Sequence, residues 1–77
     1  MQAKVNGQIK ASTVRVVSED GVDMGVFSLR DALALVVSRK EDLVEIDSEA
    51  EPPVCQVINY GKYRYRLQQA RKDREHE

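Results

Sequence analysis

One short stretch of the sequence combines the two kinds of side chain that bind unpaired RNA. It reads Tyr60-Gly-Lys-Tyr-Arg-Tyr-Arg66, so that basic residues alternate with aromatic rings. Lysine and arginine neutralise phosphate groups, and a tyrosine ring can stack on an unpaired base. Residues 60–72 hold five basic side chains and no acidic one. The stretch therefore predicts an RNA-contacting segment, whose candidate contacts are Tyr60, Lys62, Tyr63, Arg64, Tyr65, Arg66, Arg71 and Lys72.

The same pattern also has a purely structural interpretation. On a helix, Tyr60, Tyr63, Leu67 and Ala70 form one narrow apolar stripe. The two tyrosines then belong to the domain core, and the basic side chains form a solvated face. Both interpretations can hold together, with Tyr60 and Tyr63 turned inward and the cations turned outward. The stripe is too narrow for a helix that lies on a membrane.

The remaining reactive side chains do not predict an enzyme, a cofactor or a metal site. Cys55 and His76 are the single cysteine and the single histidine, and together they cannot supply three or four metal ligands. Cys55 falls in an apolar stretch, whereas a reactive thiol needs an exposed electropositive setting. The scattered glycines form no phosphate-binding loop. The acidic residues between Glu45 and Glu51 are interpreted as a solvated loop rather than a cation site.

The chain's 77 residues fit one small domain with a thin core. A single cysteine cannot form an internal disulfide, and no apolar run reaches about 18 residues, so we expect a cytoplasmic protein. The net charge of −1 hides an uneven distribution. Residues 29–53 carry three basic and seven acidic side chains, whereas residues 54–77 carry six basic and three acidic ones. This asymmetry indicates a polyanionic partner for the carboxy-terminal part.

Local patterns predict strands near 13–18, 24–27, 43–47 and 54–58, a helix over 28–40 and a second helix from Tyr60. The Asp20-Gly21 pair suits a hairpin turn, and Gly25 within a strand indicates a bulge or a close backbone approach. Ser28 and Asp31 have capping-box spacing. The first helix has an apolar stripe of Leu29, Ala32, Leu33, Val36 and Val37, and Arg39 and Lys40 fall in its last turn.

The order β-β-α-β-β predicts an α+β fold, a four-stranded mixed sheet of β-grasp (ubiquitin-like) type with the first helix packed across one face. We expect a flexible arm over residues 1–12, the β-grasp-like domain over 13–59 and a linker helix over 60–77. Because the linker helix has only one apolar side chain per turn, its start should dock on the domain and its end should project into solvent.

Several segments resemble the bacterial translation initiation factor three family, and they occur in the family's order. Glu51-Pro-Pro-Val-Cys55 followed by Tyr60-Gly-Lys62 is similar to the family signature. Upstream, the matching segments are Val5-Asn-Gly-Gln-Ile-Lys10, Val14-Arg-Val16, Gly25-Val-Phe-Ser-Leu29 and Asp42-Leu-Val-Glu-Ile46. The resemblance covers residues 5–65 and points to the amino-terminal domain of the family. It implies a β-grasp-like domain with a linker helix and no catalytic activity.

The resemblance also implies partners. The family binds the small ribosomal subunit, keeps the large subunit from joining early, and helps to select initiator transfer RNA and the start codon. Its amino-terminal domain contacts ribosomal RNA on the platform, near the initiator transfer RNA. We therefore expect a monomer that contacts ribosomal RNA and proteins, and no membrane. The contacts that the motif positions imply are Asn6, Lys10, Arg15, Lys62, Arg64 and Tyr65.

The chain departs from the family pattern at four places. Lys10 replaces an arginine, Gln56 a basic residue and Asn59 an aspartate, and residues 71–77 carry mixed charge instead of a lysine-rich linker. The family's carboxy-terminal domain is absent from this sequence. An alternative function stays open: a β-grasp protein-interaction module that acts through the acidic loop 47–53 and a sheet edge.

Overall fold

The computed structural model describes the backbone of residues 3–75 and the side chains of residues 3–69. Its elements are a 3₁₀ helix η1 (Asn6–Gln8), strands β1 (Thr13–Val17) and β2 (Asp23–Ser28), helix α1 (Leu29–Ser38), strands β3 (Asp42–Asp47) and β4 (Val54–Ile58), and helix α2 (Tyr60–Glu75). The predicted β-β-α-β-β order and α+β class are confirmed. The predicted boundaries differ from these by one or two residues.

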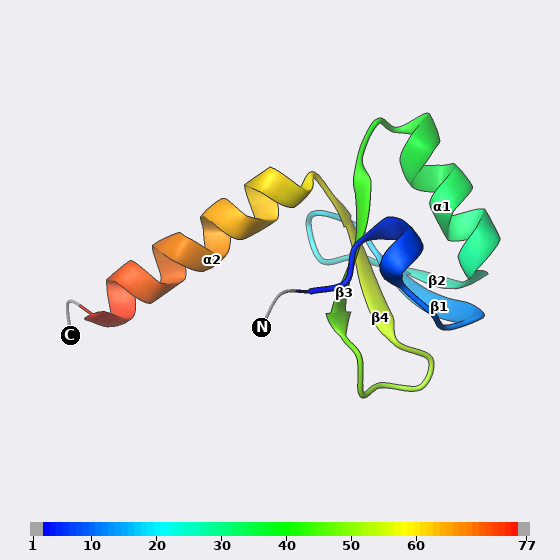
Figure 1. Cartoon of the computed structure of the whole chain (residues 1–77), viewed down its shortest axis with the longest axis horizontal. Helices are drawn as coiled ribbons and strands as arrows, with labels where there is room; N and C mark the ends of the chain where they lie inside the picture. Colours follow the sequence, from blue (N-terminus) through cyan, green and yellow to red (C-terminus); the bar gives the residue numbers. More distant parts are fainter. Residues whose placement is uncertain (1–2, 76–77) are drawn as a thin grey trace.

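The four strands form one mixed sheet in the order β2-β1-β4-β3. The outer pairs β1–β2 and β3–β4 are antiparallel, and the central pair β1–β4 is parallel. Helix α1 packs beside the sheet, and α2 leaves the end of β4 and points away from it (Figure 1). The predicted four-stranded sheet with one packed helix and one projecting helix is therefore confirmed.

The β1–β2 hairpin depends on two glycines in the left-handed region of backbone space. Gly21 has a φ of 89° in the turn, which is closed by a 2.8 Å hydrogen bond from the Ser18 N–H to the Val22 carbonyl. Gly25 has a φ of 100°, and the β1–β2 register shifts beside it between Val16 and Val17. The predicted turn and bulge are both present.

Helix α1 begins at its predicted cap, where the Ser28 hydroxyl accepts a 3.1 Å hydrogen bond from the Asp31 N–H. Most of the expected apolar stripe packs on the sheet, but Val37 is 75% exposed. Leu35, which lies on the opposite flank of the stripe, packs against the core instead. The helix ends at Ser38, before Arg39 and Lys40, which the sequence had placed in its last turn.

The two faces of the sheet differ, because α1 packs on only one of them. Val14, Val16, Leu43, Cys55 and Val57 are buried on the α1 side, together with apolar side chains of that helix. Side chains alternate along each strand, so that the opposite face carries Arg15, Val44, Gln56 and Ile58. Val44 and Ile58 are fully buried there although they lie outside the cluster under α1.

The amino-terminal segment lies along the β3 edge of the sheet (Figure 1). Val5 forms a bridge with Val44, the Lys4 carbonyl accepts a 2.9 Å hydrogen bond from the Glu45 N–H, and Ile9 is buried. Part of the predicted arm 1–12 is thus packed against the domain, because one apolar side chain and a few backbone bonds anchor a segment that has no periodic pattern. The division of the chain into arm, domain and linker stays a prediction, as does the flexibility of the arm.

Candidate nucleic-acid interface

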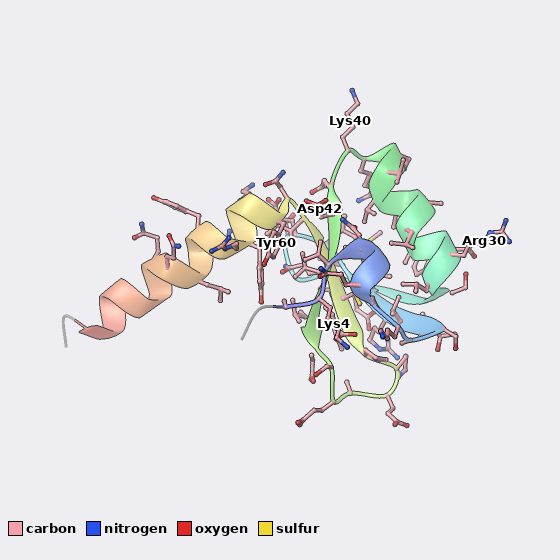
Figure 2. All side chains as sticks on the ribbon, in the orientation of Figure 1. Lys4, Arg30, Lys40, Asp42 and Tyr60 are labelled. Carbon is pink, nitrogen blue, oxygen red and sulfur yellow. The ribbon has the colours of Figure 1, made fainter. Side chains whose placement is uncertain are left out.

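The direction of α2 is set at its first turn by two side-chain caps. The Asn59 Oδ1 accepts a 3.2 Å hydrogen bond from the Lys62 N–H, and the Asp42 Oδ2 accepts a 2.9 Å hydrogen bond from the Tyr60 N–H. A carboxylate at this end of a helix also interacts favourably with the helix dipole. Figure 2 shows Asp42 on β3 beside Tyr60. The base of the basic helix is therefore tied to the sheet by Asp42.

Asp42 also holds the amino-terminal segment. Its Oδ1 accepts a 3.0 Å hydrogen bond from the Asn6 side-chain amide, and the Asn6 Oδ1 accepts a 2.8 Å hydrogen bond from the Leu43 N–H. Both ends of the Asn6 side chain are thus engaged in joining η1 to β3. The structure gives Asn6 a structural role at the junction, whereas the resemblance implied only an RNA contact.

The three tyrosines of α2 have different environments. Tyr60 and Tyr63 are half-buried and stacked on each other, with ring centroids 6.3 Å apart and an interplanar angle of 21°. The Arg64 guanidinium lies 5.9 Å from the Tyr60 centroid, in a cation–π arrangement. Tyr65 is 61% exposed. Tyr65 is consequently the α2 tyrosine whose ring is most accessible for stacking on a base.

Lys62 and Arg66 share one face of α2, one helical turn apart, and both meet Glu19 from the β1–β2 turn. The Lys62 Nζ lies 2.8 Å and the Arg66 Nη2 3.6 Å from the Glu19 Oε2. The hydrogen bond from Lys62, with the charges of both cations, lowers the pKa of Glu19 below its ordinary value. Residues 60–72 contain no acidic side chain, and Glu19 of the β1–β2 turn supplies the acidic partner for two of their cations.

The remaining predicted contacts lie elsewhere. Arg15 is on β1 and forms a 2.7 Å ion pair with Asp23 of β2, on the face of the sheet opposite α1. The hydrogen bond from the Gly25 N–H, followed by the interaction with Arg15, lowers the pKa of Asp23. Lys10 is exposed between η1 and β1. Arg71 and Lys72 belong to α2, but their side chains lie outside the described residues.

Sequence reasoning missed three residues that organise this surface: Glu19, Asp42 and Gln56. Gln56 donates 3.2 Å hydrogen bonds to the Ser18 and Glu19 carbonyls and so fixes the turn that carries Glu19. The only signal for Gln56 was its place in the family signature, where a basic residue is usual. Asp42 lay in a segment that matches the family, and Glu19 carried only the signal of its charge; neither pattern indicated their partners, which are distant in sequence.

Cys55 has no access to the surface. It is fully buried under α1, and burial, with a smaller contribution from Glu45, raises the pKa of its thiol to about 11. The thiol is therefore protonated at neutral pH and unsuited to nucleophilic attack. His76, the other member of the pair considered from the sequence, lies outside the described residues.

Replacing Cys55 with alanine is expected to lower the free energy of unfolding by about 1 kcal/mol and to leave binding intact, because the thiol acts as a small apolar side chain. Urea unfolding followed by circular dichroism measures the first effect. In the unmodified protein, a thiol reagent should react slowly, at the rate at which the core opens. Rapid labelling under native conditions would contradict the buried position.

The acidic loop and α2 lie at opposite ends of β4, so they cannot form one site (Figure 1). The Asp47 carboxylate of this loop accepts hydrogen bonds from the Glu49 and Ala50 N–H groups. Among residues 3–69, whose side chains the structure describes, no group of three or more His, Cys, Asp or Glu residues is placed to hold a metal ion. Within residues 3–75, whose backbone is described, neither α1 nor α2 combines the length and the apolar character that crossing a bilayer requires.

Comparison with known proteins agrees with the motifs. Residues 5–75 match the family model described as translation initiation factor IF-3, N-terminal domain. The chain is 51% identical over 71 residues to translation initiation factor IF-3 of Neisseria meningitidis serogroup C, which covers 92% of this chain and 40% of that protein. It is 46% identical over 76 residues to the factor of Geobacter sulfurreducens, with 94% and 44% covered.

A third relative, translation initiation factor IF-3 of Chlamydia muridarum, is 44% identical over 73 residues, which cover 95% of this chain and 39% of the relative. The chain thus spans about two fifths of the length of these relatives. The family model, the level of identity and the four-stranded mixed sheet with its projecting helix lead to one conclusion. The chain belongs to the translation initiation factor IF-3 family and corresponds to its N-terminal domain.

Proposed function

We propose that this chain is the module of an initiation factor that contacts RNA of the small ribosomal subunit through the exposed face of α2. The observation that carries the proposal is the placement of Lys62 and Arg66 side by side on that face. Both side chains are half-exposed, and the accessible ring of Tyr65 belongs to the same part of the helix. Two cations one helical turn apart can each bind a phosphate, and Tyr65 can stack on an unpaired base.

The relatives are named as translation initiation factors, which supports a role in translation initiation. As part of the proposal, the module acts in the cytoplasm as a monomer without catalytic activity or a cofactor. It binds near the initiator transfer RNA and contributes to selection of that RNA and of the start site, and to keeping the subunits apart. Lys10, Arg15 and Arg64 are further proposed contacts. Because Arg64 lies over Tyr60, it faces a different direction from Lys62 and Arg66.

Replacing Lys62 and Arg66 together with alanine tests the proposal. Folding should be nearly unchanged, because exposed ion pairs contribute little to stability. Residues 1–77 should bind purified small subunits weakly, with a dissociation constant of roughly 10⁻⁴–10⁻⁶ M in physiological salt. The double variant should bind more weakly still, and the slope of log affinity against log salt concentration should fall by about two, one for each lost phosphate contact.

A control with the same loss of charge is available outside α2. Arg30 and Lys40 project from α1 and its carboxy-terminal end, and both side chains point away from α2 (Figure 2). Replacing both with alanine should leave the salt slope close to that of the unmodified chain. The α2 contact is wrong if the two double variants behave alike. A shallow salt slope in the unmodified chain would instead favour a protein partner, bound through the acidic loop 47–53 or a sheet edge.

A further inference from the structure

The β1–β2 turn is positioned to regulate the basic face of α2. We propose that Glu19 is an intramolecular competitor for the phosphate groups of RNA: it occupies Lys62 and Arg66 in the free protein and must release them when RNA binds. This inference rests on the proposed function and adds to it a control element within the chain. Three observations support it: the turn that carries Glu19 is fixed, its carboxylate is shared by two cations, and all three side chains are partly exposed.

The turn that carries Glu19 is fixed at several points. Ser18 closes it through the hydrogen bond from its N–H to the Val22 carbonyl, and its hydroxyl accepts a 3.0 Å hydrogen bond from the Val22 N–H. From the sheet, the Gln56 amide donates to the carbonyls of Ser18 and Glu19. These bonds hold the backbone of Glu19 close to α2. Because the turn and α2 belong to the same chain, the carboxylate meets the helix at a high effective concentration.

A single carboxylate oxygen serves both cations. The Glu19 Oε2 lies 2.8 Å from the Lys62 Nζ and 3.6 Å from the Arg66 Nη2. A phosphate needs the same hydrogen-bond donors, so that Glu19 and a phosphate cannot both bind Lys62 with full geometry. Binding of RNA to this face consequently has to displace Glu19, which lowers the apparent affinity.

The contact is weak enough to be displaced. Glu19 and both cations are partly exposed, and such pairs contribute little and are screened by salt. RNA presents several phosphates to the same face, whereas the turn presents one carboxylate. The base of α2 does not depend on Glu19, because Asp42 and Asn59 hold the first turn independently. The turn can therefore release the helix face without loss of the fold.

A third predicted contact cation is also paired with an acidic residue of the β1–β2 hairpin. Arg15, which the resemblance implies as an RNA contact, is paired with Asp23 at the other end of the same hairpin turn. The hairpin thus provides the acidic partner for three of the predicted contact cations, Arg15, Lys62 and Arg66. Of the two acidic residues, only Glu19 contacts α2, and the experiment below therefore tests Glu19.

Glu19→Gln removes the negative charge and keeps the length of the side chain. In physiological salt, we expect this variant to bind purified small ribosomal subunits about two- to fivefold more tightly than the unmodified chain, which is the range that an exposed ion pair supplies. Asp20→Asn is the matched control, because it makes the same change of charge at the neighbouring, exposed position of the turn. Its effect should be well below that of Glu19→Gln.

Glu19→Gln in the Lys62→Ala/Arg66→Ala background completes the test as a double-mutant cycle. The gain should disappear there, since no cation remains to be released. The inference is overturned if Glu19→Gln binds like the unmodified chain or no better than Asp20→Asn, or if the gain persists without Lys62 and Arg66. If Lys62→Ala/Arg66→Ala itself binds normally, the proposed RNA contact has failed, and this outcome is distinct from a failure of Glu19 alone.

Discussion

Replacing Asp42 with alanine is expected to lower the free energy of unfolding by about 2 to 3 kcal/mol and to loosen two segments at once. One carboxylate accepts hydrogen bonds from the Asn6 side chain and from the Tyr60 N–H. Hydrogen bonds to a charged acceptor are among the stronger ones, and the variant also removes a helix cap. The amino-terminal segment and the start of α2 should then be held less tightly against β3.

Urea unfolding gives the stability change, and amide hydrogen exchange at Tyr60 reports the state of the helix start. The side-chain amide of Asn6 should change its NMR shift in the same variant. Asp42→Asn is the informative control, because its one side-chain oxygen can replace only one of the two acceptors. It should therefore lose about half as much stability as Asp42→Ala. Normal protection of the Tyr60 amide in Asp42→Ala would show that the Asn59 cap alone is sufficient.

Replacing Leu43 with alanine should have a still larger effect on stability, a loss of about 2–5 kcal/mol. Leu43 is fully buried and packs in the cluster under α1, where the missing atoms would leave a cavity. A 77-residue chain is expected to have a total stability of only about 4–12 kcal/mol. The variant should therefore be partly unfolded at moderate temperature.

Thermal unfolding followed by circular dichroism measures this loss. Ile46→Ala is a suitable control, because Ile46 lies on the same strand but is 42% exposed. Its cost should stay below about 1 kcal/mol. Equal destabilisation by the two variants would mean that the core does not centre on the α1 side of β3.

Local signals in the sequence were sufficient to predict the elements of the fold. Gly21 and Gly25 mark a turn and a bulge because their backbone angles are strained for other residues, and Ser28 marks a helix start because its hydroxyl satisfies a free N–H. Each of these signals concerns neighbours in the chain. Val37 was wrongly assigned to the core, because spacing alone cannot tell which flank of a stripe the sheet covers.

The site was only partly predictable. The sequence indicates which cations are present on α2 and that Lys62 and Arg66 share a face. It does not indicate that Glu19 contacts them, because the Lys62–Glu19 contact spans 43 positions. The contact also depends on the hydrogen bonds by which Gln56 positions the β1–β2 turn. Asn6 shows the same limit, since its two partners are 36 and 37 positions away. Contacts between residues so far apart arise only once the sheet has assembled, and they produce no periodic pattern in the sequence.

The projecting helix has a mechanical consequence. Its 16 residues correspond to a rod of about 24 Å, and the side-chain contacts described along it all lie within its first two turns. A rod held near one end amplifies rotation, so that a change of about 10° at Asp42 and Glu19 would move the far end by about 4 Å. Small rearrangements of two carboxylates at the base would therefore displace the carboxy-terminal end of α2.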